Sequence, residues 1–131
     1  HSLQRPETLS HIDPVYANFL FTGDGIRLID WEYAGMADPL IDFAMATIYA
    51  EKDFDYAFRL LDYYGDTDVP REQAKQLVTA YMALGGFLWA LWAVYKEALG
   101  VSFGTYPLTQ YRYAKEGYRR FSERENDADS L

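Results

Sequence analysis

The chain contains no cysteine and no long run of lysine or arginine residues. The absence of cysteine excludes a disulfide framework and a thiolate metal site. The absence of a basic stripe, together with a formal net charge of -8, argues against a nucleic-acid partner and fits a cationic small molecule better. No secretory signal is visible, and we expect a cytoplasmic location.

Hydrophobic residues, by contrast, make up 50% of the 131 residues, which is enough for one domain with a core. One stretch, residues 77–95, carries no formal charge and is long enough to span a membrane as a helix. It contains the Gly85-Gly86 pair, a threonine and two tyrosines, and it lacks the asymmetric basic flanks of a simple anchor. We therefore expect a helix buried in a globular lobe and no membrane span, with a membrane-anchored segment as the alternative.

Turn signals and apolar spacing predict an α+β fold that is mainly helical. Two short apolar runs, residues 19–22 and 26–30, flank Gly23-Asp24-Gly25 and predict a β-hairpin, because glycine permits the positive φ angles of tight turns. Four further stretches are bounded by cap residues, prolines or glycines and are expected to be helices: residues 38–50, 54–64, 70–99 and 108–124. Residues 125–131 are polar and acidic and are expected to form a disordered tail.

Polar residues at fixed spacing surround the predicted hairpin. His11, Asp13 and Asn18 precede it, and Asp30 and Glu32 follow it. Transfer of a γ-phosphoryl group needs a carboxylate near the acceptor hydroxyl and hard oxygen ligands for Mg²⁺. Asp13 is the candidate for the first role, and Asn18 and Asp30 can converge on one ion because the hairpin returns the chain. Glu32 could reach a second metal or metal-bound water.

Each of these residues also has an ordinary structural interpretation. Asp13, Asn18 and Asp30 could all be turn or loop residues. Their ordered combination, followed by Asp38-Pro39-Leu40-Ile41-Asp42, resembles the choline/ethanolamine kinase and aminoglycoside phosphotransferase branch of the protein-kinase-like fold. The resemblance implies ATP as co-substrate, Mg²⁺, and an Asp42 that braces the catalytic loop near a structural His11; on its own, Asp42 would be read as a first-turn helix acid.

Two tryptophans in the long apolar stretch bear on the acceptor. Trp89 and Trp92 share one helix face, and core packing is the ordinary explanation for such spacing. The pair resembles the Trp-x-x-Trp of choline kinases, which implies a cation–π pocket for the ammonium group, completed by Tyr113 from the following helix. Choline is thus the expected acceptor. Ethanolamine and aminoglycoside kinases are the alternatives, along with a non-catalytic choline- or headgroup-binding module.

The sequence departs from that family in three respects. Ile12 and Pro14-Val15 stand where eukaryotic choline kinases have Asn and Leu-Gln, a pattern closer to bacterial members. The acid that faces the ammonium in those relatives falls near residues 49–51, without a fixed register. No Gly-rich loop or strand lysine is present, so we expect residues 1–124 to be the C-terminal catalytic lobe of a longer polypeptide. That lobe should be inactive or nearly so by itself, and its exposed apolar surface should favour self-association.

Overall fold

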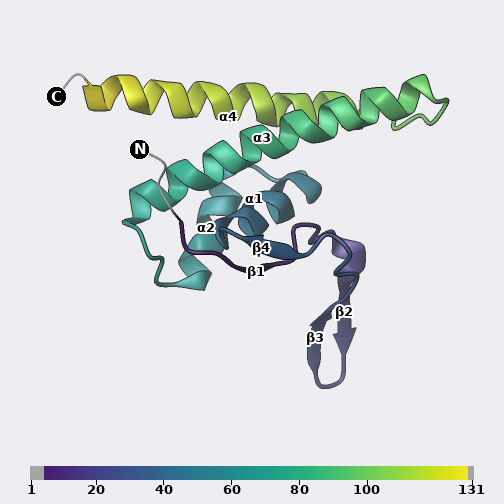
Figure 1. Ribbon diagram of the computed structural model, residues 1–131, viewed down its shortest axis with the longest axis horizontal. Coiled ribbons are helices and arrows are strands. Elements are labelled where there is room, and N and C mark those ends of the chain that lie inside the picture. The colour runs from purple at the N-terminus through teal and green to yellow at the C-terminus, as the bar shows by residue number, and fades with distance from the viewer. Residues whose placement is uncertain (1–4, 130–131) are drawn as a thin grey trace.

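The structure, a computed structural model, describes residues 5–129, with side-chain surroundings up to residue 123. Short strands lead into a set of helices, in chain order: β1 (Thr8–Ser10), the 3₁₀ turn η1 (Tyr16–Asn18), β2 (Phe19–Thr22), β3 (Gly25–Leu28), β4 (Gly35–Ala37), α1 (Leu40–Tyr49), α2 (Phe54–Tyr64), α3 (Arg71–Ala98) and α4 (Tyr106–Asp129). The predicted mainly helical α+β fold is confirmed (Figure 1).

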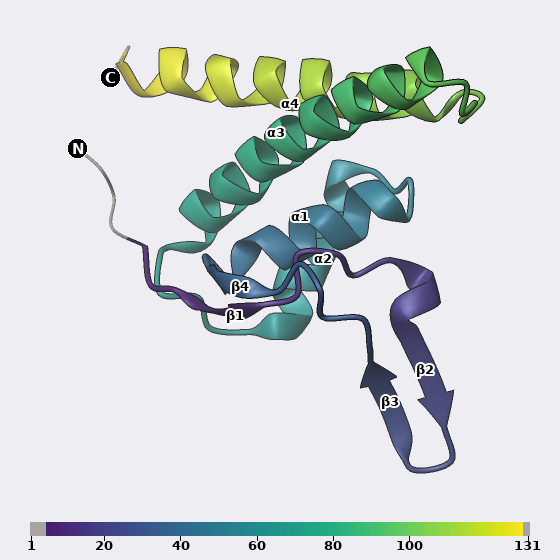
Figure 2. The same cartoon turned by 45° about the vertical axis from the view of Figure 1, so that its right-hand side comes forward.

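The strands form two separate antiparallel pairs. β2 and β3 form the predicted hairpin, with Thr22 opposite Gly25, and it projects away from the helices (Figure 2). β1 pairs with β4, so residues 8–10 lie beside residues 35–37 and close a loop that contains the whole hairpin. The sequence did not predict this second pair, because strands of three residues are too short to show an alternating pattern.

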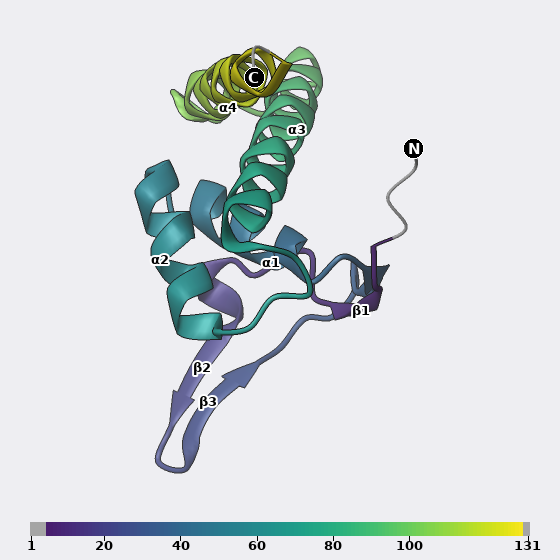
Figure 3. The same ribbon diagram turned by 90° about the vertical axis from the view of Figure 1, so that its left-hand side faces the viewer.

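The helices stack in layers. α3 lies between α1 and α4, and the hairpin is on the opposite side of α1 from α4 (Figure 3). The core consists of apolar side chains of all four helices: Leu40, Ala44, Met45, Ile48, Phe54, Ala57, Leu61, Ala74, Val78, Met82 and Tyr113. α3 meets the length and hydropathy criteria for a membrane span, and part of it is buried between its neighbours. That the chain has no membrane span therefore stays a prediction.

Gly85 and Gly86 explain how α3 can contact helices on two sides. A Cβ atom added at Gly85 would lie 2.4 Å from the Met45 Cε atom of α1. At Gly86 the same addition would lie 2.6 Å from the Gln110 carbonyl oxygen of α4. The atom near Gly86 is backbone and cannot move aside, so this glycine sets the close approach of α4 to α3. The atom near Gly85 is the flexible end of Met45, which a larger side chain would have to displace.

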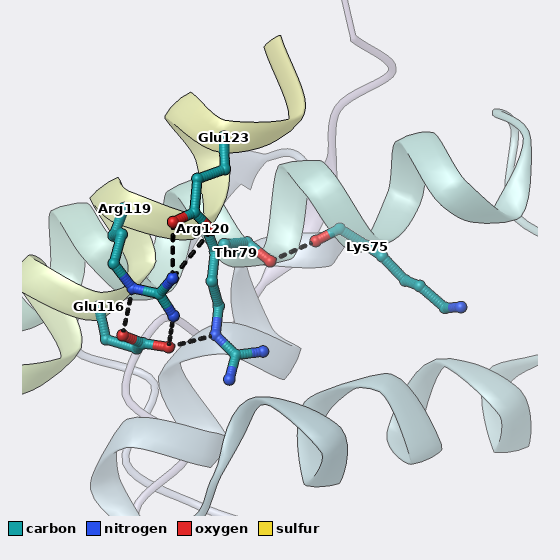
Figure 4. Close-up of polar contacts among 6 residues, drawn as sticks. All are labelled: Lys75, Thr79, Glu116, Arg119, Arg120 and Glu123. Atoms are coloured by element: carbon teal, nitrogen blue, oxygen red, sulfur yellow. Dashed lines mark hydrogen bonds and ion pairs between the residues drawn. The ribbon is translucent and has the colours of Figure 1, made fainter. Parts of the chain in front are cut away.

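Ion pairs run along the exposed surface of α4, which extends to Asp129, beyond the predicted end at residue 124. We define the α4 ion network as Glu116, Arg119, Arg120 and Glu123: Arg119 donates to both glutamates and Arg120 donates to Glu116 (Figure 4). Glu, Arg and Ala favour helix, which explains why the helix includes part of the stretch predicted as a tail. Residues 130–131 of that predicted tail lie outside the described residues.

Candidate active site

Asp13 lies in the loop between β1 and η1, on a backbone that Asp42 holds in place. The Asp42 carboxylate accepts hydrogen bonds from the backbone N–H groups of His11 and Ile12, both at 2.8 Å. Ile12 has a φ of 70°, a left-handed conformation that a β-branched residue rarely adopts. We call these two bonds the loop clamp. They hold the backbone in a costly conformation immediately before Asp13.

His11 links the same loop to the segment that directly follows β3. Its side chain is 1% exposed, and its Nε2 atom lies 2.8 Å from the carbonyl oxygen of Ile29. A carbonyl can only accept, so Nε2 carries the proton and donates it. The ring also packs edge-on against Trp31, with ring centroids 4.7 Å apart. This arrangement supports the structural role suggested for His11.

Backbone pairing at the base of the hairpin places Asn18 beside the residue that precedes Asp30. The Asn18 amide nitrogen donates to the Asp13 carbonyl oxygen at 3.0 Å. The backbone N–H of Ile29, the residue before Asp30, donates to the Asn18 carbonyl oxygen at 2.9 Å. Asp30 itself is exposed and has a φ of 61°. Within residues 5–129 no group of three or more His, Cys, Asp or Glu residues forms a metal cluster.

A cleft of about 440 Å³ joins Asp13 to the long apolar helix. Its walls come from the loop after β1, the segment after β3 and the C-terminal half of α3: Asp13, Glu32, Tyr33, Leu88, Trp89 and Trp92. The two indoles are in edge-to-face contact, with ring centroids 5.6 Å apart and planes at 84°. Both predicted tryptophans and the predicted carboxylates Asp13 and Glu32 therefore line one cavity.

Further aromatic rings extend this wall, and the sequence analysis did not identify them. Phe103 lies 5.1 Å from the Trp92 ring and 6.3 Å from Tyr106. Tyr49, at the end of α1, lies 5.8 Å from Trp89. Phe103 precedes α4 and had no helical neighbours to suggest its position, whereas Tyr49 lies in the region where an acid was expected. Lys96 covers part of the Trp92 ring at 5.6 Å, so this indole already contacts a cation.

Tyr113 is not brought to the cleft. It is buried against Phe54, with ring centroids 6.3 Å apart, and its hydroxyl donates to the Lys52 carbonyl oxygen at 2.7 Å. Gly86 allows α4 so close to α3 that the Tyr113 Cβ atom belongs to the helix contact. Tyr106 lies seven residues before Tyr113, on the same face of α4. Its ring contacts Phe103, and Phe103 in turn packs against Trp92.

Charges near the cleft shift the pKa values of two tyrosines. Burial raises the pKa of Tyr49, and the negative charge of Asp13 raises it further. Burial also raises the pKa of Tyr106, with smaller contributions from the charges of Glu51 and Asp13. The Asp13 carboxylate is thus close to aromatic hydroxyls from α1 and α4, and both phenols stay protonated at neutral pH.

The chain matches the sequence model of a phosphotransferase enzyme family, APH, over residues 1–94. It is 35% identical over 103 residues to Protein LicA of Haemophilus influenzae, a match that covers 75% of this chain and 39% of that protein.

Solved structures agree with this assignment. The structure of LicA in complex with AMP has a TM-score of 0.71 at 33% identity, covering 88% of this chain and 40% of that one. Choline kinase LicA from Streptococcus pneumoniae has a TM-score of 0.67 at 35% identity, with 85% and 39% covered. A choline/ethanolamine kinase family protein from Mesorhizobium loti has a TM-score of 0.75 at 27% identity, with 90% and 42% covered. The chain spans about 40% of the length of these relatives and belongs to the phosphotransferase enzyme family.

Proposed function

We propose that the chain is the catalytic lobe of an ATP-dependent choline kinase, and that it transfers the γ-phosphoryl group to the hydroxyl of choline. The observation that carries the proposal is the single cleft lined by Asp13 and by Trp89 and Trp92. A carboxylate and two indoles in one cavity are suited to an acceptor that has a hydroxyl at one end and a quaternary ammonium at the other.

In this proposal Asp13 accepts the proton of the acceptor hydroxyl. The hydroxyl oxygen attacks the γ-phosphorus, the bond from that phosphorus to the β–γ bridging oxygen breaks, and ADP leaves with the bonding electrons. The loop clamp supports this role, because two backbone hydrogen bonds to Asp42 fix the main chain immediately before the carboxylate. A carboxylate held in one orientation loses little entropy when the acceptor binds.

The predicted metal ligands fit Mg²⁺ by chemistry. Mg²⁺ prefers oxygen ligands, usually keeps several waters and needs only one or two protein ligands when it also binds phosphates. Asn18 uses its amide nitrogen in the bond to the Asp13 carbonyl, which leaves its amide oxygen for a metal. Asp30 would supply a carboxylate from the segment whose backbone pairs with Asn18 at Ile29. Glu32 would hold a second metal or its water. When bound, the ion would neutralise charge that develops on the transferred phosphate.

The aromatic wall favours choline over the alternatives. An aminoglycoside site should gather several carboxylates around a polyamine, whereas this cleft has Asp13 and Glu32 opposite aromatic and aliphatic side chains. Glu32 nevertheless offers an ion pair to a primary ammonium, which makes ethanolamine the stronger rival. A quaternary ammonium cannot donate hydrogen bonds and gains more from the indole faces.

We also propose that a further N-terminal lobe of the same polypeptide binds most of the nucleotide, and that this chain alone has little or no activity. The relatives, one of them solved with AMP, are more than twice as long as the chain. Several apolar side chains of α3 are exposed, including Leu84, Leu88, Leu91 and Tyr95. Self-association of the isolated chain through such a surface remains a prediction.

The experiment uses the two-lobed polypeptide, by which we mean this chain together with the proposed N-terminal lobe. Choline, ethanolamine and kanamycin are compared as acceptors in the presence of Mg²⁺ and ATP, and the products are followed by ³¹P NMR. The proposal predicts phosphocholine as the preferred product, with kcat/KM for ethanolamine lower. Replacement of Asp30 by Asn should weaken the Mg²⁺ dependence of the rate. Choline binding without any transfer would indicate a non-catalytic binding module, and preference for kanamycin would overturn the choline assignment.

A further inference from the structure

Two buried polar atoms beside the cleft make no hydrogen bond of ordinary geometry among the described residues. They are the Tyr49 hydroxyl oxygen and the Trp89 indole nitrogen, and the two rings lie 5.8 Å apart. A buried polar group without a partner costs about 1 to 3 kcal/mol, so native structures rarely leave one unused. Finding two such groups next to each other at a candidate active site calls for a shared explanation.

Their chemistry is complementary. An indole N–H can only donate a hydrogen bond, a carboxylate can only accept one, and a phenol can do both. Trp89 lines the cleft together with Asp13, and Asp13 is close enough to Tyr49 for its charge to raise the pKa of the phenol. A donor and an acceptor that match the two functions of the phenol are therefore both near Tyr49.

We propose that the Tyr49 hydroxyl accepts a hydrogen bond from the Trp89 indole N–H and donates one to the Asp13 carboxylate. The inference rests on the proposed function, in which Asp13 accepts the proton of the acceptor. Tyr49 is then a positioning residue, because it fixes the base relative to the indole that holds the ammonium group. The distance between these two walls decides whether the acceptor hydroxyl reaches the carboxylate.

The link also gives a reason for the position of Tyr49 at the last residue of α1. The first turn of the same helix carries Asp42, whose carboxylate holds the backbone before Asp13. Both ends of α1 thus contact the loop that carries Asp13. Asp42, near the start of the helix, binds the main chain of the loop, and Tyr49, at the end of the helix, binds the Asp13 carboxylate.

The first test uses the 131-residue chain and does not depend on activity. The sequence has three tryptophans, so the ¹H–¹⁵N spectrum should contain three indole signals, and Trp89→Phe assigns one of them. Tyr49→Phe should move the Trp89 signal upfield and speed its exchange with solvent. The Trp31 indole donates to the Leu28 carbonyl at 2.9 Å and serves as the internal reference.

The second test uses the two-lobed polypeptide. Tyr49→Phe should lower kcat about tenfold, the loss expected for one hydrogen bond to a charged group, while the choline KM changes less than threefold. Tyr81→Phe is the matched control, because it also removes the hydroxyl of a tyrosine that is partly buried. Tyr81 lies on α3, and its hydroxyl donates to Asp38 at 2.8 Å. That variant should reproduce any general loss of stability without the selective loss of kcat.

The outcomes separate this inference from the function on which it depends. An unchanged Trp89 signal and an unchanged kcat in Tyr49→Phe, with Asp13→Asn inactive, would overturn the inference and leave the proposed function intact. If Asp13→Asn kept its turnover, the proposed function would fail together with the positioning role. The change of the Trp89 indole signal in Tyr49→Phe would then be the remaining test of the hydrogen bond between Trp89 and Tyr49.

Discussion

The loop clamp and the α4 ion network use the same kinds of group in different surroundings. In the loop clamp one partly buried carboxylate, Asp42, accepts two backbone N–H groups, and the residues it holds are distant in the sequence. In the α4 ion network, Glu116, Arg119 and Glu123 are exposed partners one turn apart on one helix. Burial makes the first set costly to break, whereas water and salt replace much of the second.

This difference indicates where the fold serves the chemistry. The loop clamp fixes a left-handed Ile12 immediately before Asp13, so its loss should affect both folding and catalysis. The α4 ion network stabilises a helix whose backbone hydrogen bonds are already satisfied. Substitutions in the two regions should therefore differ both in size and in kind.

The largest effect is expected at Asp13. In the two-lobed polypeptide, Asp13→Asn should lower kcat by about 10²- to 10⁴-fold, because an amide of similar shape cannot accept the hydroxyl proton. The fold should be retained, which circular dichroism of the variant would check. Asp55→Asn changes an exposed carboxylate on α2 and is the control. Near-normal turnover in Asp13→Asn would exclude Asp13 as the base.

Loss of the loop clamp comes next. Asp42→Ala leaves the N–H groups of His11 and Ile12 without an acceptor, and hydrogen bonds to a charged group contribute about 1.5 to 3 kcal/mol each. For the two bonds together, we expect the free energy of unfolding to fall by about 3 to 6 kcal/mol in urea titrations. Turnover of the two-lobed form should fall as well. A stable variant with normal turnover would show that the clamp is dispensable.

A neighbouring buried carboxylate, Asp38, gives the region of the loop clamp a pH dependence. Burial tends to raise the pKa of Asp38, but hydrogen bonds from Arg5, the Leu40 N–H and Tyr81 outweigh it and leave the pKa below its usual range. A lowered pKa in the folded state means that this stability is present above the unfolded value of about 3.9 and is lost as the pH falls through the folded value.

The urea concentration at the unfolding midpoint should accordingly fall when the pH is lowered below about 4. Asp38→Asn should reduce this acid sensitivity and lower the free energy of unfolding at pH 7. Asp66→Asn, in an exposed loop, is the comparison variant. Identical acid unfolding of the wild type and Asp38→Asn would remove Asp38 from the account.

The smallest effect is expected in the α4 ion network. Hydrogen bonds from Arg119 and, to a smaller extent, from Arg120 lower the pKa of Glu116 to about 2. These groups are at the surface, however, where solvent screens their charges. Arg119→Ala should leave the thermal unfolding midpoint nearly unchanged, and added salt should erase any difference. A loss comparable to that of Asp42→Ala would contradict the contrast between the two regions.

Local signals predicted most of the secondary structure. The Phe54–Tyr64 helix has the predicted bounds because Asp53 caps its first turn and Gly65 ends it with a φ of 88°. The Asp13, Asn18 and Asp42 arrangement could be anticipated because the residues lie at characteristic spacing and resemble a known family. These features depend on neighbours in the sequence, which a single sequence displays.

The parts that could not be predicted depend on tertiary distances. Tyr113 was expected at the cleft, but the contact between Gly86 and α4 buries it against Phe54. Phe103 and Tyr49 contact Trp92 and Trp89 only because the loop before α4 and the end of α1 pack against the same part of α3. Helical spacing gives the face of a residue, but it does not give the point at which two helices cross.

The choline KM of Trp92 variants in the two-lobed polypeptide tests the central claim, that the indoles hold the acceptor opposite Asp13. Trp92→Ala should raise the choline KM about two- to thirtyfold, as expected for a lost cation–π contact of about 0.5 to 2 kcal/mol, with the KM for ATP unchanged. Trp92→Phe should lose less, because a phenyl ring keeps part of the attraction. Equal loss for choline and ATP, accompanied only by a lower unfolding midpoint, would contradict the account and make Trp92 a core residue.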